Sequence, residues 1–509
     1  MAKERISKMN YQNPVIRGFN PDPSICRVGD DYYLVTSTFE YFPGIPVYHS
    51  RDMVNWEHIA NAVTRESQLP LERVSASGGI WAPTIRYNEG RFFITATFSE
   101  TGNFIIYADD PRGEWSDPVW VEMDGIDPSM LFDNGRMYYC ANDYGSRGDL
   151  HETEGISVAE VDPFTGKVKG EIRRVWDGMG GGWIEAPHIY RIGERYYILA
   201  AEGGTGVRHH EVAARSNSIF GPYEPCPFNP ILTNRNDTSK QINCSGHADL
   251  IEGSDGEWWL VHLGTRPYVG GKTTLGRETF LTRAEWKDGW PVAAGKRAVI
   301  ENEAPKGAVQ KPQCGKEFDF KSGEWEPQWL FVRSRDDELI SRGGGKMVLK
   351  PDARLTDEKG SISLAALRQP DLECVCEAEL DFEPENDGDE AGMAAYLTPR
   401  NIYRICKRRD GGRNYIVVQK KADDFEQEIY REAAPDGRLI LRINADREKY
   451  SFSYSVNGSG FIDTGQASAK FLTTDAADRC FTGTVIGVYA QSDTKTDAAA
   501  MISRFCMKC

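Results

Sequence analysis

Three carboxylates occupy similar places in a phrase that the chain repeats. Asp22 opens "DPSICRVGDDYY", Asp127 opens "DPSMLFDNGRMYY", and Glu185 directly precedes "APHIYRIGERYY". Each stands within two residues of a proline, ahead of an alternating run, a glycine-containing turn and paired aromatic residues. Three carboxylates at one point can divide proton donation, water activation and pKa tuning among themselves. Acid–base catalysis is therefore the first hypothesis, provided that the fold brings the three together.

The repeated sequence occurs five times, and each copy predicts a β-hairpin. Two further copies begin at Ala82 ("APTIRYNEGRFF") and at His247 ("HADLIEGSDGEWW"). Spacings of about 45–60 residues leave room for four strands per copy, which is typical of β-propeller blades. The sequence therefore predicts an all-β fold that begins with a five-bladed β-propeller. A β-sandwich with accidental repetition is the alternative.

The same position of every blade of a propeller lies beside the central axis, so the repeated residues should converge. They are Asp22, Asp127, Glu185 and His247, with Trp81 of "IWAP" beside them. Clustering carboxylates away from water is costly, so a purely structural role would favour Asn or Ser. Each Asp-Pro pair taken alone is also explained by turn capping. Together, without a metal motif or a Ser/His/Asp order, the carboxylates suggest glycoside hydrolysis: one protonates the leaving oxygen and another activates water or attacks the anomeric carbon.

A chain of 509 residues is long enough for two domains. The repeated phrase does not return after Lys316, and plainly alternating strands follow, such as "RLILRI" at 438–443 and "YSFSYSV" at 450–456. We therefore expect a propeller at 10–300, a linker at 301–316 and a concanavalin-like β-sandwich at 317–509.

Composition excludes several classes of partner. The net charge of -16 disfavours nucleic acid and anionic membranes. The first residues, "MAKERISKMNYQNPV", contain no apolar segment of a signal peptide, and no run of 18 apolar residues occurs, so a cytoplasmic protein is expected. The 11 scattered cysteines fit reduced thiols better than a disulfide framework.

Seven ordered motifs resemble glycoside hydrolase family 43, and within it the β-xylosidases that carry a C-terminal β-sandwich. They are "NPDPSI", "YFPGIPVYHSRDMVNW", "GGIWAPTIRY", "GIDPSMLFDNG", "WIEAPHIY", "GHADL" and "TLGRETF". The resemblance implies an inverting mechanism on a five-bladed propeller. By motif, Asp22 resembles the general base, Glu185 the general acid, and Asp127 the carboxylate that tunes and orients the acid. Inversion requires room for a water molecule between base and acid.

The resemblance also implies substrate-binding residues. Arg277 matches a sugar-binding arginine, and Phe39 and Trp81 match aromatic walls of the sugar site. His247 matches a histidine in the channel beneath the site, where some relatives hold a calcium ion and its waters, so the resemblance makes this channel a candidate Ca²⁺ site. No cofactor is required for the chemistry. In "RHHEV", adjacent residues of a strand point to opposite faces, so we do not expect His209 and His210 to bind one metal ion together. We expect His210 to face the substrate.

The implied activity is release of xylose from the non-reducing ends of xylooligosaccharides, together with α-L-arabinofuranosidase activity on arabinosyl-substituted oligosaccharides. A loop of the sandwich should narrow the pocket, and the segments 146–155 and 234–246 should add walls. A pocket tryptophan expected of the family is not evident within 142–155. We also expect a homo-oligomer, either a dimer or a tetramer. An endo-arabinanase-like hydrolase and a non-catalytic carbohydrate-binding propeller remain as alternatives, whereas the sequence lacks the WMNDPNG, RDP and ECP motifs of retaining fructan-active propellers.

Overall fold

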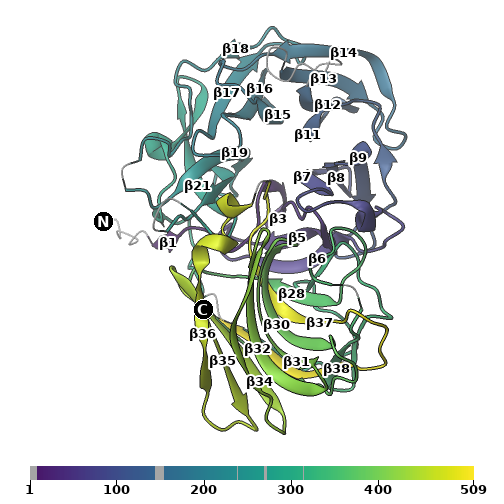
Figure 1. Ribbon diagram of the computed structural model, residues 1–509. Helices are drawn as coiled ribbons and strands as arrows, with labels where there is room; N and C mark the ends of the chain where they lie inside the picture. Colours follow the sequence, from purple (N-terminus) through teal and green to yellow (C-terminus); the bar gives the residue numbers. More distant parts are fainter. Residues whose placement is uncertain are drawn as a thin grey trace.

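The computed structural model describes residues 9–143, 154–237, 239–268, 272–312, 315–352, 354–477 and 479–509. Over these residues the chain is a ring of five four-stranded sheets followed by a two-sheet sandwich (Figure 1), which confirms the predicted fold. The described helices are short 3₁₀ turns: η1 (Leu71–Arg73), η2 (Ala294–Lys296), η3 (Ala469–Leu472) and η4 (Thr474–Ala476). None of the described helices has the length and apolar character needed to cross a membrane.

Each blade is an antiparallel sheet whose innermost strands are the hairpin read from the sequence. Blade one contains β2 (Ser24–Val28), β3 (Asp31–Val35), β5 (Gly44–Ser50) and β6 (Glu57–Val63), and blade two contains β7 (Ile80–Asn88), β8 (Arg91–Phe98), β9 (Gly102–Ala108) and β10 (Val119–Trp120). Blade three contains β11 (Ile126–Asp133), β12 (Arg136–Asp143), β13 (Gly155–Val161) and β14 (Val168–Trp176). Blade four contains β15 (Glu185–Ile192), β16 (Arg195–Glu202), β17 (His210–Ser216) and β18 (Glu224–Pro225), and blade five contains β19 (Asn243–Glu252), β20 (Trp258–Thr265), β21 (Glu278–Lys287) and β22 (Trp290–Ala293).

One backbone feature recurs at the start of every repeat. The residues Asp22, Ala82, Asp127, Ala186 and His247 all have φ between 41° and 54°, in the left-handed region. In blades two to five the pairing register of the inner strand shifts at this point. Such a conformation costs a non-glycine residue about 1–3 kcal/mol and persists only where the surrounding fold imposes it. A register shift of this kind redirects side chains, and here the side chain at this position or the one before it reaches the axis.

The ring is closed by the segment ahead of blade one. β1 (Asn10–Gln12) pairs with β23 (Glu301–Glu303), which follows blade five. The Val15 amide then donates to the Thr279 carbonyl on β21 at 2.9 Å. The two ends of the propeller sequence therefore lie side by side, and the inner strands contact one another around the ring.

The sandwich consists of two curved sheets that enclose an apolar core. One sheet is ordered β26 (Ile340–Gly343), β27 (Lys346–Leu349), β38 (Ala500–Lys508), β29 (Cys374–Asp381), β34 (Leu439–Ala445), β35 (Lys449–Val456) and β36 (Ile462–Ser468), with β24 (Lys316–Phe318) also paired to β38. The other is ordered β33 (Phe425–Ala433), β32 (Arg413–Ala422), β31 (Asn401–Asp410), β30 (Glu390–Thr398), β37 (Val485–Gln491), β28 (Leu364–Arg368), β25 (Leu330–Val332) and β4 (Tyr41–Phe42). Since β4 belongs to blade one by sequence, the propeller lends an edge strand to the sandwich.

The segment between β36 and β37 crosses from the sandwich to the ring (Figure 1). The Thr474 amide donates to the Thr273 carbonyl at 3.1 Å, and the Phe481 amide donates to Ser77 Oγ at 2.9 Å. A Cβ atom at Gly483 would lie 2.3 Å from the Leu275 carbonyl oxygen, so this approach requires glycine. The contacts hold Phe481 at the mouth of the propeller axis.

Candidate active site

A cavity of about 440 Å³ lies at the end of the propeller axis. Residues of all five blades and of the sandwich line it: Asp22, Phe39, Trp81, Ile126, Asp127, Trp183, Glu185, Gly203, Gly204, Thr205, Gly206, His209, His247, Arg277, Arg479 and Phe481. The structure thus brings together seven of the eight residues that the sequence singled out, and His210 is the one left outside.

Asp22 is held in its ionised form. Arg277 Nη1 donates to Asp22 Oδ1 at 2.7 Å, Ser37 Oγ donates to Oδ2 at 2.6 Å, and His247 Nδ1 lies 3.4 Å from Oδ1. Burial opposes ionisation, but the charge of Arg277 and the contacts with His247 and Ser37 hold the pKa of Asp22 well below its usual range. An ionised carboxylate can accept a proton, so Asp22 is suited to activate water.

Asp127 and Glu185 have the opposite tendency. Burial raises the pKa of both carboxyl groups, and the neighbouring Asp127 carboxylate raises the pKa of Glu185 further. The backbone amide of Asp127 donates to Thr97 Oγ1 at 3.2 Å. A carboxyl group that stays protonated near neutral pH can donate a proton to a leaving oxygen. The pocket therefore combines a base form and an acid form of the same functional group.

One wall of the pocket is aromatic, as expected of a sugar site. The ring centroids of Phe39 and Phe481 are 5.8 Å apart, and those of Trp81 and Phe481 are 6.4 Å apart in an edge-on arrangement. The Arg277 guanidinium lies over both phenylalanine rings, at 5.7 and 5.8 Å from their centroids. Arg277 therefore joins the aromatic wall to the Asp22 carboxylate.

Phe481 and Arg479 are pocket residues that the sequence did not identify. The guanidinium of Arg479 lies 5.5 Å from the Trp81 ring centroid and 5.3 Å from that of Phe481. Trp183, two residues ahead of Glu185, is a third, and its side chain is 44% exposed at the rim. "WIEAP" offered a signal for Trp183, whereas "RCFTG" in the second domain offered none. The sandwich does supply a pocket wall, as expected.

The structure corrects the choice between the two adjacent histidines. His209 lines the pocket, whereas His210 Nε2 lies 3.5 Å from Glu202 Oε2, and Glu202 accepts from the Gly181 amide at 3.1 Å. Alternation along a strand shows that neighbours face opposite ways, but not which of them faces inward. His210 thus holds Glu202 behind the pocket wall.

Two further expectations concern walls of the pocket. Most of the segment 146–155 lies outside the described residues. The same holds for most of 142–155, the region in which the pocket tryptophan of the family was expected. The segment 234–246, apart from residue 238, is described and does not line the cavity. The loop containing Gly203 to Gly206 lines that side instead.

The channel beneath His247 contains a fixed cation. The Arg86 guanidinium donates to both carboxylate oxygens of Asp249, at 2.8 and 3.2 Å, and lies 3.2 Å from His188 Nδ1. Burial lowers the pKa of His188 to about 3, so its ring is neutral. Within the described residues no three His, Cys, Asp or Glu side chains form a metal-binding group. A positive charge here repels a second one, so these residues do not fit a calcium ion, and no step of the chemistry is assigned to one.

Two family models match most of the chain. Residues 11–291 match the family described as glycosyl hydrolases family 43. Residues 317–508 match the domain described as beta xylosidase C-terminal concanavalin A-like domain.

Individual relatives extend over nearly full length. A non-reducing end alpha-L-arabinofuranosidase of Bacteroides ovatus is 38% identical over 507 residues, covering 97% of this chain and 93% of the relative. A beta-xylosidase of Bacillus subtilis is 33% identical and covers 95% of this chain and 96% of the relative. The solved structure of a xyloglucan-locus protein of Bacteroides ovatus superimposes with a TM-score of 0.93 at 36% identity, covering 98% of this chain and all of that one.

Proposed function

Because the chain belongs to glycoside hydrolase family 43, we propose that it releases single xylosyl and α-L-arabinofuranosyl residues from the non-reducing ends of short oligosaccharides. The observation that carries this proposal is the pairing of two carboxyl groups in one pocket. Asp22 has a lowered pKa and Glu185 has a raised one, which is the division of labour that glycoside hydrolysis needs.

The mechanism proceeds by inversion in a single displacement. Asp22 takes a proton from water, and the water oxygen forms a bond to the anomeric carbon from the face opposite the leaving group. The bond from that carbon to the glycosidic oxygen breaks as Glu185 gives its proton to the departing oxygen. The products are a single sugar of inverted anomeric configuration and the remaining oligosaccharide, which carries the new hydroxyl group. Asp22 ends protonated and Glu185 ionised, and exchange with solvent restores both.

Asp127, Arg277 and His247 prepare the two catalytic groups. Arg277 and His247 stabilise the charge of Asp22, so that it remains ionised while buried. The charge of Asp127 discourages ionisation of Glu185 and so keeps its proton available. Phe39 and Trp81 offer flat apolar faces to the ring C–H groups of a sugar.

The shape of the pocket supports attack at chain ends. A groove open on both sides would bind the middle of a polymer, as an endo-arabinanase-like enzyme does. Here Phe481 and Arg479 of the sandwich line one side of the cavity, and Trp183 lines the rim. A volume of about 440 Å³ suits one or two pentose units.

Two relatives bear names for two different sugars, and they motivate dual specificity. One is named for α-L-arabinofuranoside and the other for β-xyloside, and another relative, from Butyrivibrio fibrisolvens, is named xylosidase/arabinosidase at 35% identity. A single pocket can accept both sugars, because both place similar hydroxyl groups around one anomeric carbon.

A direct test compares turnover of 4-nitrophenyl β-D-xylopyranoside and 4-nitrophenyl α-L-arabinofuranoside by the full chain. NMR of the early product should show inverted configuration, and xylobiose should yield xylose while polymeric xylan is barely attacked. Retained configuration would refute the mechanism. Absence of turnover on both glycosides would instead favour a carbohydrate-binding propeller.

A further inference from the structure

A second cavity, larger than the active site, lies elsewhere in the molecule. A cavity of about 720 Å³ lies between blade one, the connecting segment and the sandwich. Tyr48 and His58 line it from the propeller, Lys311 and Lys316 from the connection, and Arg368 from the sandwich. It exceeds the active-site cavity of about 440 Å³. Its volume lies in the range of small-molecule sites, which also favour domain interfaces.

Arg368 carries a positive charge that no carboxylate of the described residues neutralises. Its Nε donates to the Phe19 carbonyl at 2.7 Å, and its guanidinium lies 5.3 Å from the centroid of the Phe19 ring. Arg368 is half-buried as a residue, but its Nη2 is occluded and has no hydrogen-bond partner among the described residues. Buried cations are normally paired, because desolvation of an isolated charge is costly.

The contrast with other arginines is informative. Carboxylates raise the pKa of Arg86, Arg266 and Arg404 despite burial. Among the described arginines with a shifted pKa, Arg368 is the one whose pKa falls, because burial is not balanced by an acid. The Arg368 guanidinium therefore has no carboxylate counter-ion among the described residues.

The other charges at this cavity do not supply that counter-ion. The Asp52 carboxylate accepts from the Val54 and Asn55 amides at 2.9 and 2.8 Å and so closes its own turn. Glu57 is exposed. No carboxylate of the described residues is among the charges that act on Arg368.

Cations are otherwise prominent at the cavity. Lys311 and Lys316 line it without an ion pair to any described residue, whereas Arg17 Nη1 pairs with Asp371 at 2.8 Å and Arg51 Nε with Asp31 at 3.1 Å. Lys316 is exposed at the mouth and can adjust to a ligand. For a chain of net charge -16, a concave site with three unpaired cations is unusual.

We propose that this interdomain cavity binds a small polyanion, a metabolite carrying phosphate or carboxylate groups, through Arg368, Lys311 and Lys316. The charged groups of the ligand complete the pairing that Arg368 lacks, since guanidinium recognises both oxyanions by charge-assisted hydrogen bonds. The aromatic pair Tyr48 and His58, with ring centroids 4.8 Å apart, lines the cavity beside these cations and can contact the remainder of the ligand.

Such a ligand would connect the two domains and touch the support of the active site. Arg368 holds the Phe19 carbonyl, and Phe19 packs on Phe39 of the sugar wall with centroids 6.0 Å apart. Tyr48 OH donates to Asn20 Oδ1 at 2.6 Å, two residues ahead of Asp22. Binding should therefore stabilise the docked sandwich, because a ligand that binds only the folded state shifts the unfolding equilibrium.

The test is calorimetric titration of the full chain with inorganic phosphate, pyrophosphate and citrate at constant ionic strength. We expect saturable binding of one anion per chain, competed by the other anions and accompanied by a higher midpoint of thermal unfolding. Arg368→Gln should weaken binding about tenfold or more, since it removes a charged donor. Lys316→Gln, at an exposed position where folding is safe, should weaken it about two- to fivefold. Arg400→Gln, on an exposed sandwich loop away from the cavity, is the matched control and should bind as the parent does.

The titrations with the three anions distinguish a phosphate ligand from a carboxylate ligand. Binding of phosphate and pyrophosphate but not citrate indicates a phosphate ligand, and the reverse indicates a polycarboxylate. Phosphate and citrate also stabilise proteins without binding, by exclusion from the surface. If no anion gives saturable heat, or if Arg368→Gln and Lys316→Gln keep the parent affinity, the proposal is overturned. This result is independent of glycosidase activity, which the same preparation reports separately.

Discussion

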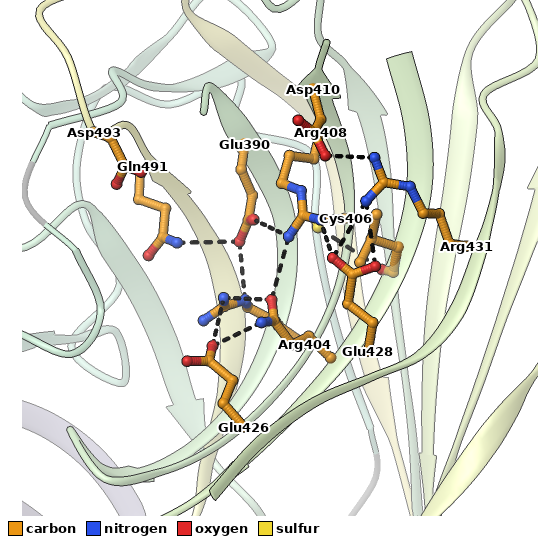
Figure 2. A network of polar contacts seen from close by, with 12 residues as sticks. Glu390, Arg404, Cys406, Arg408, Asp410, Glu426, Glu428, Arg431, Gln491 and Asp493 are labelled. Atoms are coloured by element: carbon orange, nitrogen blue, oxygen red, sulfur yellow. Dashed lines mark hydrogen bonds and ion pairs between the residues drawn. The ribbon is translucent and has the colours of Figure 1, made fainter. Parts of the chain in front are cut away.

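The active-site pocket and the outer face of one sandwich sheet both gather charged side chains, and they arrange them differently. In the pocket, three carboxylates share Arg277 and His247. On the sandwich face, carboxylates and guanidinium groups of β30, β31 and β33 lie next to one another (Figure 2). The ion pairs there are Arg404–Glu390 at 3.0 Å, Arg404–Glu426 at 3.1 Å, Arg408–Glu390 at 3.9 Å, Arg431–Asp410 at 2.5 Å, Arg431–Glu428 at 3.3 Å and Arg408–Glu428.

The pKa values follow from this difference. In the sandwich network, neighbouring carboxylates raise the pKa of Arg404 although burial opposes this, and Arg408 and Arg431 lower the pKa of Glu428 although burial opposes that too. Every charge there is stabilised by its neighbours. In the pocket, burial and like charge raise the pKa of Glu185. A matched network favours a fixed structure, whereas an unmatched cluster keeps a proton ready for transfer.

The largest effect should come from removing a catalytic carboxylate. Asp22→Ala and Glu185→Ala should each lower kcat by about 10²–10⁴-fold or more. For Glu185→Ala the loss should shrink on dinitrophenyl xyloside, whose leaving group departs without a proton. Steady-state kinetics on aryl xylosides of graded leaving-group acidity measures this. An equal loss on every leaving group would remove Glu185 from the acid role.

Breaking the matched network should damage stability and not catalysis. Arg404→Met removes the nearest cation of Glu390 and of Glu426, so the buried Glu390 carboxylate keeps only the more distant Arg408, at 3.9 Å. Removing one partner of a buried ion pair costs about 3–5 kcal/mol. Urea denaturation followed by tryptophan fluorescence should show the loss, while kcat of the folded enzyme stays at the parent value. The exposed pair of Arg400 with Asp423 provides the control, and Arg400→Gln should leave the denaturation midpoint unchanged. A large fall in kcat for Arg404→Met would mean that the two regions are not separable.

Removing one of the like charges in the pocket should shift the pH profile of the enzyme's activity. Glu185 must be protonated to act, and its raised pKa has burial as the first cause and the Asp127 charge as the second. Asp127→Asn removes that charge, so the pKa of Glu185 falls and activity is lost at lower pH than in the parent. A shift of one pH unit corresponds to about tenfold less activity on the alkaline side. The pH dependence of kcat/KM measures the limb, and an unchanged alkaline limb would exclude Asp127 from tuning.

The two regions also differ in how far the sequence predicts them. The pocket carboxylates were predictable because five repeats share one register, so a position read once applies to all blades. The left-handed residues at Asp22, Asp127 and His247 are that register seen in the backbone. Phe481 and Arg479 were not predictable, since they reach the pocket through docking of a domain that lacks the repeat. The choice of His209 over His210 likewise depends on the facing of β17, which alternation alone leaves undetermined.

The smallest effect concerns the residue by which the sandwich enters the pocket. Phe481 contacts Phe39 and Trp81, and Arg277 lies over its ring while Arg277 Nη2 donates to the Phe481 carbonyl at 3.3 Å. Phe481→Ala keeps that backbone contact and removes the ring. An aromatic contact contributes about 0.5–1.5 kcal/mol, so kcat/KM on xylobiose should fall about two- to twelvefold.

The matched control for Phe481 lies on the same crossing segment. Phe471 is 48% exposed and does not line the cavity, so Phe471→Ala removes an equal side chain without touching the pocket. Steady-state kinetics on xylobiose should show a parent-like kcat/KM for this variant. If both variants lose activity equally, the segment acts through docking of the sandwich as a whole. If neither variant loses activity, the sandwich contributes only stability, and the propeller alone forms the functional pocket. A selective loss of activity for Phe481→Ala would show that the sandwich, which supplies no catalytic carboxylate, shapes the pocket that contains them.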